Sequence, residues 1–315
     1  MILVTGATGF VGSALVARLA REGTETRACV RRNGASLPDG VHTVQVAGLT
    51  ADTDWRHALA GVAVVVHAAA RVHVMVDAAT DPLAEFRRVN VDGTLNLARQ
   101  AAAAMVKRFV FISSVKVNGE ATLPGRPFTA DDAPAPLDPY GVSKMEAEQG
   151  LRQIAAQTGM AVVIIRPPLV YGPGVKANFA ALMRAVQRGW PLPLGAVHNQ
   201  RSLVALDNLV DFIVTCITHP QAANQTFLVS DGHDLSTTEL VRGLARAARM
   251  PVRLLPVPVW ALRAGAALLG KGDAVQRLCG NLQVDISKAR SLLGWTPPIS
   301  VDDGLRRAVA GMGKS

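Results

Sequence analysis

The first half of the chain alternates short apolar runs with longer stretches in which apolar residues recur at helical spacing. Several runs are apolar at every position, as expected for parallel strands that are buried on both faces. Residues 13–21 and 89–104 predict two helices between these runs. The alternation predicts an α/β fold with a Rossmann-type, doubly wound parallel sheet. Its six predicted strands are residues 2–4, 25–31, 41–46, 63–66, 109–112 and 162–165.

Proline and glycine interrupt this pattern in the second half of the chain. Examples are Gly172-Pro173-Gly174 and Pro191-Leu192-Pro193. We therefore divide the chain into a first domain, residues 1–166, and a smaller, discontinuous C-terminal α/β region, residues 167–315. A segment around residues 196–218 is expected to return to the first domain.

Composition excludes several classes of protein. Apolar residues make up 49% and charged residues 18% of the 315 residues, which excludes a disordered chain. The net charge is +9, but the basic residues are scattered and lack interleaved aromatics, so we expect no nucleic-acid binding. Three widely spaced cysteines and seven histidines without ligand spacing predict neither a disulfide framework nor a metal site.

The longest apolar stretches are residues 58–70 and 256–270. Both are shorter than the ~20 apolar residues that a membrane-spanning helix needs. The chain also enters its first strand without the features of a secretory signal. We expect a cytoplasmic protein without stable membrane insertion. Residues 256–270 predict either a membrane-contacting amphipathic helix or a buried helix, and we favour the buried one.

Three glycines follow the first strand at a spacing of three, in Thr5-Gly6-Ala7-Thr8-Gly9-Phe10-Val11-Gly12. Glycine permits a tight turn and lets a diphosphate approach the backbone amides, and the N-terminus of the following helix attracts the phosphate charge. Strand, turn and helix together predict a dinucleotide-binding site, whereas the alternative is a glycine-rich turn without a ligand.

Tyr140 and Lys144 are four residues apart and share one face of a predicted helix. An ammonium group beside a phenol favours the phenolate, so the pair predicts a general acid–base for hydroxyl–ketone interconversion. The alternative is a surface pair. Ser114 follows a buried strand at the edge where open α/β sheets bind ligands. It is expected either to hydrogen-bond a substrate oxygen or to cap a turn.

These motifs resemble the extended short-chain dehydrogenase/reductase family, which includes nucleotide-sugar epimerases, dehydratases and reductases. The TGxxGxxG pattern matches residues 5–12 and YxxxK matches residues 140–144. The family's active-site Ser/Thr matches Ser114, and its helix Asn near the active site matches Asn90. The resemblance covers nearly the whole chain.

The resemblance implies a role for each matching residue. The first domain would bind the dinucleotide and the second region mainly the substrate. Ser114, Tyr140 and Lys144 would be catalytic, and Ser114, Asn178 and Arg201 would bind substrate, with Arg201 on the diphosphate of a sugar nucleotide. Cofactor contacts would come from Gly6, Gly9, Phe10, Val11, Gly12, Arg31, Arg32, Leu49, Ala68, Ala69, Ala70, Asn90, Tyr140, Lys144 and Pro167.

The end of the second strand departs from the pattern of NAD-dependent members. Those carry Asp there, whereas this chain has Val30 followed by Arg31 and Arg32. No acid would repel a 2′-phosphate and two guanidinium groups could hold one, so the sequence favours NADP(H) over NAD(H). The alternative is that the two arginines merely border the adenine pocket.

The residues after Ser114 narrow the activity. The resembling 4,6-dehydratases carry Asp-Glu there, whereas this chain has Val115-Lys116, so we expect no dehydratase. Residues 113–120 and 199–203 resemble reductases of UDP-4-keto-6-deoxy-HexNAc, which form UDP-N-acetylquinovosamine for bacterial surface polysaccharide or O-antigen. We therefore predict a nucleotide-sugar 4-ketoreductase, homodimeric as the resemblance implies. The rivals are a UDP-hexose or UDP-HexNAc 4-epimerase that retains NAD, and a non-catalytic dinucleotide-sensing scaffold.

Overall fold

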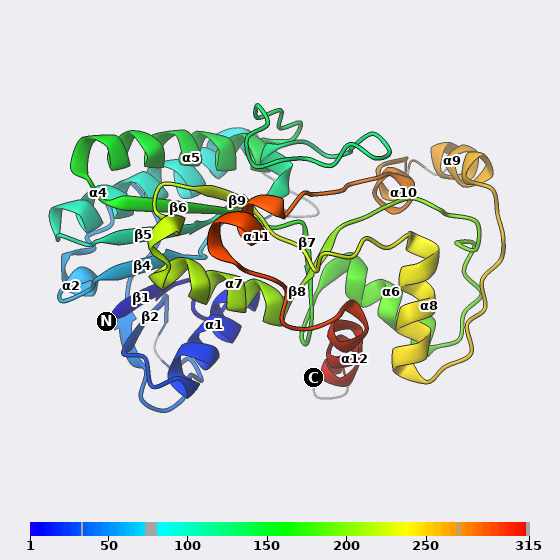
Figure 1. The fold of residues 1–315 in the computed structure, drawn as a ribbon, viewed down its shortest axis with the longest axis horizontal. Helices are drawn as coiled ribbons and strands as arrows, with labels where there is room; N and C mark the ends of the chain where they lie inside the picture. Colours follow the sequence, from blue (N-terminus) through cyan, green and yellow to red (C-terminus); the bar gives the residue numbers. More distant parts are fainter. Residues whose placement is uncertain (33, 73–80, 269, 271, 313–315) are drawn as a thin grey trace.

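The computed structural model describes residues 1–32, 34–72, 81–268, 270 and 272–312. Its larger lobe contains a seven-stranded sheet in the order β3-β2-β1-β4-β5-β6-β9, in which every neighbouring pair is parallel (Figure 1). The predicted doubly wound α/β fold is confirmed, and the six predicted strands are correct to within one residue at each end. The strands are β1 (Ile2–Thr5), β2 (Thr26–Val30), β3 (His42–Gln45), β4 (Val64–His67), β5 (Arg108–Ile112), β6 (Ala161–Arg166) and β9 (Thr226–Leu228).

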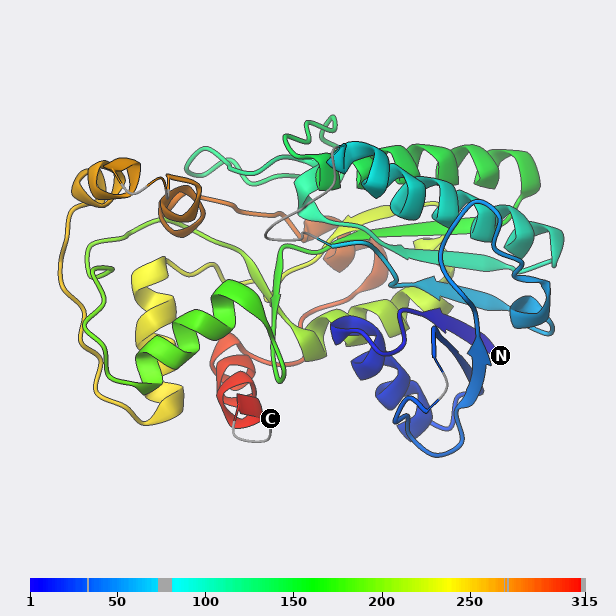
Figure 2. The same ribbon diagram turned by 180° about the vertical axis from the view of Figure 1, so that it is seen from behind.

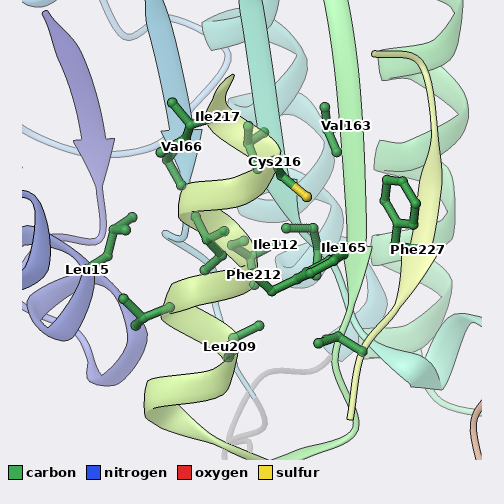
Figure 3. Close-up of a cluster of buried hydrophobic side chains, with 14 of the residues drawn as sticks. Leu15, Val66, Ile112, Val163, Ile165, Leu209, Phe212, Cys216, Ile217 and Phe227 are labelled. Carbon is green, nitrogen blue, oxygen red and sulfur yellow. The ribbon is translucent and has the colours of Figure 1, made fainter. Parts of the chain in front are cut away.

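Helices cover both faces of the sheet and form a hydrophobic core with each face. In the first core, shown in Figure 3, Leu15 and Phe212 lie against strand residues such as Val66 and Ile165. The helices of this face are α1 (Phe10–Arg21), α7 (Leu206–Thr218) and α11 (Ser287–Leu293). The opposite face carries α2 (Arg56–Leu59), α4 (Thr94–Ala103) and α5 (Pro139–Thr158).

A π-helical turn precedes α4. The predicted helix over residues 89–104 is divided into this turn, η1 (Arg87–Gly93), and α4 itself, and α3 (Pro82–Phe86) leads into it. Single π-turns inside helices frequently mark functional sites. Here the turn contains Asn90.

The smaller lobe is built around the two-stranded parallel sheet of β7 (Leu169–Tyr171) and β8 (Leu203–Ala205). Tyr171, Phe179 and Leu305 belong to its hydrophobic core. Its helices are α6 (Ala177–Gln187), α8 (Thr237–Ala248), α9 (Val259–Leu268), α10 (Gly272–Cys279) and α12 (Val301–Gly311). Two short 3-10 turns, η2 (Val115–Val117) and η3 (Pro220–Ala222), pack in the larger lobe. The chain passes between the lobes more than once, because α7 and β9 pack in the larger lobe although they follow β8.

The expectation that residues 256–270 form a buried helix is wrong. Within α9, Ala266 is the one buried residue among those described, whereas Trp260 is 74% and Leu268 is 89% exposed. The apolar composition alone does not show which face of a short helix finds a partner. No helix in the described ranges is both long enough and apolar enough to cross a membrane.

Candidate active site

A cavity of about 1400 Å³ lies along the carboxyl ends of the sheet strands. It includes the point between β1 and β4 where the strand order changes direction, which is where doubly wound sheets bind ligands. The cavity gathers segments that are far apart in the sequence. Its lining contains most of the predicted site residues: Gly6, Gly9, Phe10, Val11, Gly12, Arg31, Leu49, Ala68, Ala69, Ala70, Ser114, Tyr140, Lys144 and Pro167.

The glycine turn after β1 is closed so tightly that two of its positions exclude a side chain. Gly6 has a φ of +68°, and a Cβ there would lie 2.8 Å from the Ala68 carbonyl carbon. A Cβ on Gly12 would lie 2.1 Å from the Gly6 oxygen, whereas one on Gly9 would meet the same atom at 3.1 Å. Gly6 and Gly12 therefore permit the turn itself, and Gly9 leaves its surface open toward the cavity.

Helix α1 begins at Phe10 directly behind this turn. No side chain caps its N-terminus, its first turn carries no acidic residue, and residues 10–13 line the cavity. Free amide groups at a helix N-terminus attract anions. The open glycine surface and the uncapped helix thus fit the diphosphate of a dinucleotide.

Lys144 is anchored below the cavity floor. Its side chain is 2% exposed, and its Nζ donates a hydrogen bond of 2.8 Å to the Ile112 carbonyl oxygen at the end of β5. The Nζ also lies 4.4 Å from the centre of the Phe111 ring. Burial lowers the pKa of Lys144 to about 7, although the nearby Glu148 carboxylate opposes this shift.

Tyr140 lies on the same face of α5, one turn before Lys144. The Lys144 Nζ is 6.0 Å from the centre of the Tyr140 ring, so the two groups are neighbours without a direct hydrogen bond between them. Burial, and secondly the Asp138 carboxylate, raise the pKa of Tyr140. In this ligand-free arrangement the phenol holds its proton at neutral pH.

Asp138 is the acid closest in sequence to the Tyr140 phenol, and its charge is compensated. One carboxylate oxygen caps α5 by accepting a hydrogen bond of 2.7 Å from the Gly141 amide. The other oxygen contacts the Lys116 ammonium, which also pairs with Glu120 at 3.2 Å. Lys116 therefore partly neutralises the carboxylate that disfavours the Tyr140 phenolate.

Ser114 lies at the start of η2, where its hydroxyl accepts a hydrogen bond of 3.2 Å from the Lys116 amide. Ser114 therefore caps the turn, as one of the two expectations held. It also lines the cavity, as Tyr140 does. Capping and substrate contact are compatible, because a hydroxyl that accepts one bond keeps its own proton to donate.

A buried ionic network beneath the cavity was not anticipated from the sequence. Arg166 at the end of β6 donates to both Glu148 carboxylate oxygens, at 2.9 and 2.6 Å, and the Ser113 hydroxyl donates to one of them at 2.6 Å. Arg166 also donates to the Asn118 side chain at 3.0 Å. Glu148 and Arg166 are each 1% exposed. The network fastens α5, which carries Tyr140 and Lys144, to the segment that carries Ser114.

His67 at the end of β4 is fully buried, and both of its ring nitrogens lie within hydrogen-bonding distance of threonine hydroxyl groups. Its Nδ1 lies 2.6 Å from the Thr5 hydroxyl and its Nε2 lies 2.9 Å from the Thr94 hydroxyl. Burial, and secondly Lys144, lower its pKa to about 3, so the ring is neutral. Among the described residues no group of three or more His, Cys, Asp or Glu side chains is placed to hold a metal ion.

Four predicted site residues are not among the described residues that line this cavity: Arg32, Asn90, Asn178 and Arg201. Asn90 is buried and joins the Arg71 backbone to the Ser143 hydroxyl, at 2.8–3.0 Å. The Arg201 guanidinium donates to the Gly280 carbonyl at 3.0 Å, and Asn178 is exposed on the first turn of α6. Their proposed contacts with cofactor or substrate remain predictions.

Lys176 is a cavity residue that we did not single out from the sequence. It is exposed, precedes α6 and contributes to the cavity wall on the small-lobe side. A lone lysine in a loop carries no sequence signal that separates it from other surface lysines.

Comparison with known proteins connects this geometry to a family. The model of the NAD dependent epimerase/dehydratase family matches residues 2–230. The chain is 53% identical over 307 residues to the UDP-glucose 4-epimerase of Vibrio cholerae, covering 97% of this chain and 93% of the relative. It is 28% identical to the N-acetyl-α-D-glucosaminyl-diphospho-ditrans,octacis-undecaprenol 4-epimerase of Escherichia coli O157:H7, covering 98% and 94%.

Among solved structures, MoeE5 in complex with UDP-glucose and NAD has a TM-score of 0.79 and is 26% identical. The match covers 99% of this chain and 98% of MoeE5. A second MoeE5 structure contains UDP-glucuronic acid and NAD.

The expectation that the chain favours NADP(H) is wrong, because the matching family is NAD dependent and the MoeE5 structures hold NAD. The physical reason lies in Arg31 and Arg32, whose side chains are both exposed to solvent. A guanidinium that is free in water does not define a 2′-phosphate site, and the missing Asp removes a repulsion without creating a preference. The chain belongs to the NAD dependent epimerase/dehydratase family.

Proposed function

We propose that this protein is a 4-epimerase of UDP-linked hexoses or N-acetylhexosamines that keeps its NAD bound through the catalytic cycle. The observation that carries this proposal is the 53% identity to a UDP-glucose 4-epimerase over 97% of the chain. It is supported by the single cavity that joins the glycine turn to Ser114, Tyr140 and Lys144.

Bound NAD supplies the oxidising and reducing equivalents at sugar C4. The glycine turn and the N-terminus of α1 would hold its diphosphate, with Leu49 and Arg31 on the adenosine side and residues 68–70 and Pro167 toward the nicotinamide.

Tyr140 would take the proton from the C4 hydroxyl and return it after the sugar has turned its other face, which is general base and then general acid catalysis. Ser114 would donate its hydroxyl proton to O4 and hold that oxygen beside the phenol. Lys144 would bind a ribose hydroxyl, and its charge would favour the Tyr140 phenolate at the moment of proton transfer. The anchoring bond from Lys144 to the Ile112 carbonyl keeps the ammonium group at a fixed place during both transfers.

The 4-ketoreductase interpretation uses the same three side chains, so the two activities differ in what happens to the cofactor. A reductase must release the oxidised nucleotide and bind a reduced one after each turnover, whereas an epimerase regenerates its NAD within one cycle. A 4,6-dehydratase is not a third candidate, because this chain has Val115-Lys116 where those enzymes carry Asp-Glu.

The test begins with the purified protein, which is denatured so that any bound nucleotide can be identified and counted. We expect close to one NAD per chain, together with interconversion of UDP-glucose and UDP-galactose, or of UDP-GlcNAc and UDP-GalNAc, without added nucleotide. A parallel assay supplies UDP-4-keto-6-deoxy-HexNAc with NADH. Stoichiometric NADH oxidation there, without epimerisation, would establish the reductase instead. Nucleotide binding without turnover of any of these sugars would favour the scaffold.

A further inference from the structure

Helix α9 carries an apolar face that is largely exposed to solvent in the part of the chain that the structure describes. Trp260, Ala264 and Leu268 are spaced by four residues and therefore form one stripe along the helix. All three are exposed, Trp260 by 74% and Leu268 by 89%. The opposite side of the helix, with Val259 and Leu262, packs on the small-lobe core. The helix is held in place by one face and presents the other to solvent.

A second exposed tryptophan lies beside the segment that leads into α9. The Leu192 amide donates to the Arg253 carbonyl and the Leu255 amide donates to the Leu192 carbonyl, each at 2.8 Å. This short ladder begins two residues after Trp190, which is 54% exposed, and includes Leu255, which is 50% exposed. The Arg188 guanidinium lies 5.3 Å from the centre of the Trp190 ring.

The small lobe is also depleted in acidic residues around these positions. Residues 240–272 contain no Asp or Glu but five Arg and one Lys, and residues 167–206 contain no Asp or Glu but three Arg and one Lys. The first stretch alone contributes +6 to a total net charge of +9. Arg246 is partly engaged by Asp302 at 3.5 Å, whereas Arg253 and Arg263 are exposed beside the apolar side chains.

We define the outer-edge surface as Trp190, Leu255, Trp260 and Leu268 together with Arg188, Arg253 and Arg263. Its segments lie at the end of the small lobe that is farthest from the seven-stranded sheet, as Figure 2 shows for α9 and the chain leading into it. We propose that this surface docks the enzyme on a bilayer that contains anionic phospholipid.

The chemistry of the surface favours this occupant. Tryptophan and leucine on one face of a short helix, flanked by arginine and free of acids, match the requirements of an interfacial helix. Such a helix lies in the plane of the headgroups, and α9, with its 10 residues, is too short to span the hydrocarbon core. Each arginine near an anionic surface adds to the attraction. A second copy of the chain would bring the same positive charges face to face, which disfavours self-association through this surface.

The experiment is sedimentation of the full chain with vesicles of phosphatidylcholine alone and of phosphatidylcholine mixed with phosphatidylglycerol. We expect binding that requires phosphatidylglycerol and weakens as salt is raised. The tryptophan emission should shift to the blue on binding. Trp55 and Trp295 are only 2% and 5% exposed, so this change reports Trp190 and Trp260.

The test variant is Trp260→Ser with Leu268→Ser, and we expect its affinity for the mixed vesicles to fall on the order of tenfold, because interfacial binding scales with buried apolar area. Its sugar-nucleotide turnover in the absence of vesicles should be unchanged. Met105→Ser is the matched control, since Met105 is 82% exposed on the larger lobe. Arg253→Gln with Arg263→Gln provides a second test that leaves the apolar face intact, and it should reduce the dependence on phosphatidylglycerol.

Failure of the wild-type chain to bind mixed vesicles would overturn the proposal, as would equal binding by wild type and both double variants. A change in the solution mass of the Trp260→Ser, Leu268→Ser variant would show that a second copy covers this surface instead. None of these outcomes bears on the proposed epimerase activity, which is measured without lipid.

Discussion

The Lys144 ammonium group donates a hydrogen bond of 2.8 Å to the carbonyl oxygen of Ile112. This contact joins helix α5, which carries Tyr140 and Lys144, to the last residue of β5, one position before Ser113 and two before Ser114. A lysine at this place is buried with its charge close to an aromatic ring and a carbonyl group. This interaction, together with the Glu148–Arg166–Ser113 network, holds Tyr140 and Lys144 against the segment that carries Ser114.

The burial of Lys144 predicts a pH dependence of stability. The native NAD-free protein holds this group at a pKa of about 7, whereas an unshifted lysine has a value of 10.5. Between these pH values the unfolded state binds more protons, so the contribution of Lys144 to the free energy of unfolding rises with pH and levels off above the unfolded pKa. We expect urea unfolding of wild type and Lys144→Met to show that, as pH rises across this range, the free energy of unfolding of wild type increases relative to that of the variant. A difference that is independent of pH would contradict the buried, titrating lysine.

Tyr140→Phe should lower kcat by a factor of about 10²–10⁴, which is typical for the loss of a general acid–base. Bound NAD and the thermal midpoint should remain close to wild type, because the phenol makes no hydrogen bond that the fold requires. Tyr171→Phe is the natural control. The Tyr171 hydroxyl donates to Asp231 at 2.7 Å inside the small-lobe core, so its removal should cost roughly 1–3 kcal/mol of stability and leave kcat nearly unchanged. Near-normal turnover by Tyr140→Phe would remove Tyr140 from the mechanism.

Gly12→Ala should abolish NAD retention and destabilise the protein. The added Cβ would lie 2.1 Å from the Gly6 oxygen, so the turn or the start of α1 must shift. The cost should be at least several kcal/mol, judged from denaturant unfolding of the NAD-free protein. Gly265→Ala is a matched change in a helix where nothing lies within 4 Å of the new Cβ, and it should be neutral or slightly stabilising. Retained NAD in Gly12→Ala at full occupancy would contradict the phosphate-binding role that we propose for this turn.

The ionic network beneath the cavity predicts a linked loss of stability and activity. Glu148→Gln leaves the Arg166 guanidinium buried without its partner charge, which typically costs about 3–5 kcal/mol. Because the network positions α5 against β5, kcat should fall while the bound NAD content falls less. Combining Glu148→Gln with Arg166→Met should recover part of the lost stability. Additive losses in this double variant would show that the two residues act independently.

Lys116 and Asp138 are expected to set the pH at which Tyr140 works. Lys116→Met leaves the Asp138 carboxylate uncompensated near the phenol, which should move the rising limb of the kcat profile to higher pH. Asp138→Asn should move it in the opposite direction, since Asn retains the ability to cap α5 while the negative charge is lost. Identical profiles for wild type and both variants would confine this ion pair to a structural role.

Much of this arrangement could be predicted from sequence. Several of the six predicted strands are marked by apolar runs such as residues 63–66, and the glycine spacing around Gly9 predicted the tight turn after β1. The three-residue strands β7, β8 and β9 were not among the six predicted strands, because three residues are too few to show a periodicity. The Glu148–Arg166 pair was also missed, although Glu148 stands four residues after Lys144 on the buried face of α5. Its partner comes from β6, and only the folded sheet brings the two together.

The preference between NAD and NADP could not be predicted from the residue types that follow β2. Arg31 and Arg32 follow β2 as a phosphate site would require, yet both side chains lie in solvent, and residue type alone does not determine whether a charge is fixed in place. Helix α9 presents the same difficulty for apolar residues. The composition of residues 256–270 suits burial and exposure equally, and the outcome depends on which neighbours the small lobe provides.

The fate of the hydrogen at sugar C4 tests the central claim most directly. UDP-galactose that carries deuterium at C4 is incubated with the protein in ordinary water. The medium contains free NAD and no other substrate. We expect UDP-glucose to form with deuterium retained at C4, and we expect no deuterium in the free nucleotide. Absence of conversion of both this sugar and UDP-GalNAc labelled in the same way, or deuterium in released NADH, would contradict a 4-epimerase that keeps its NAD bound.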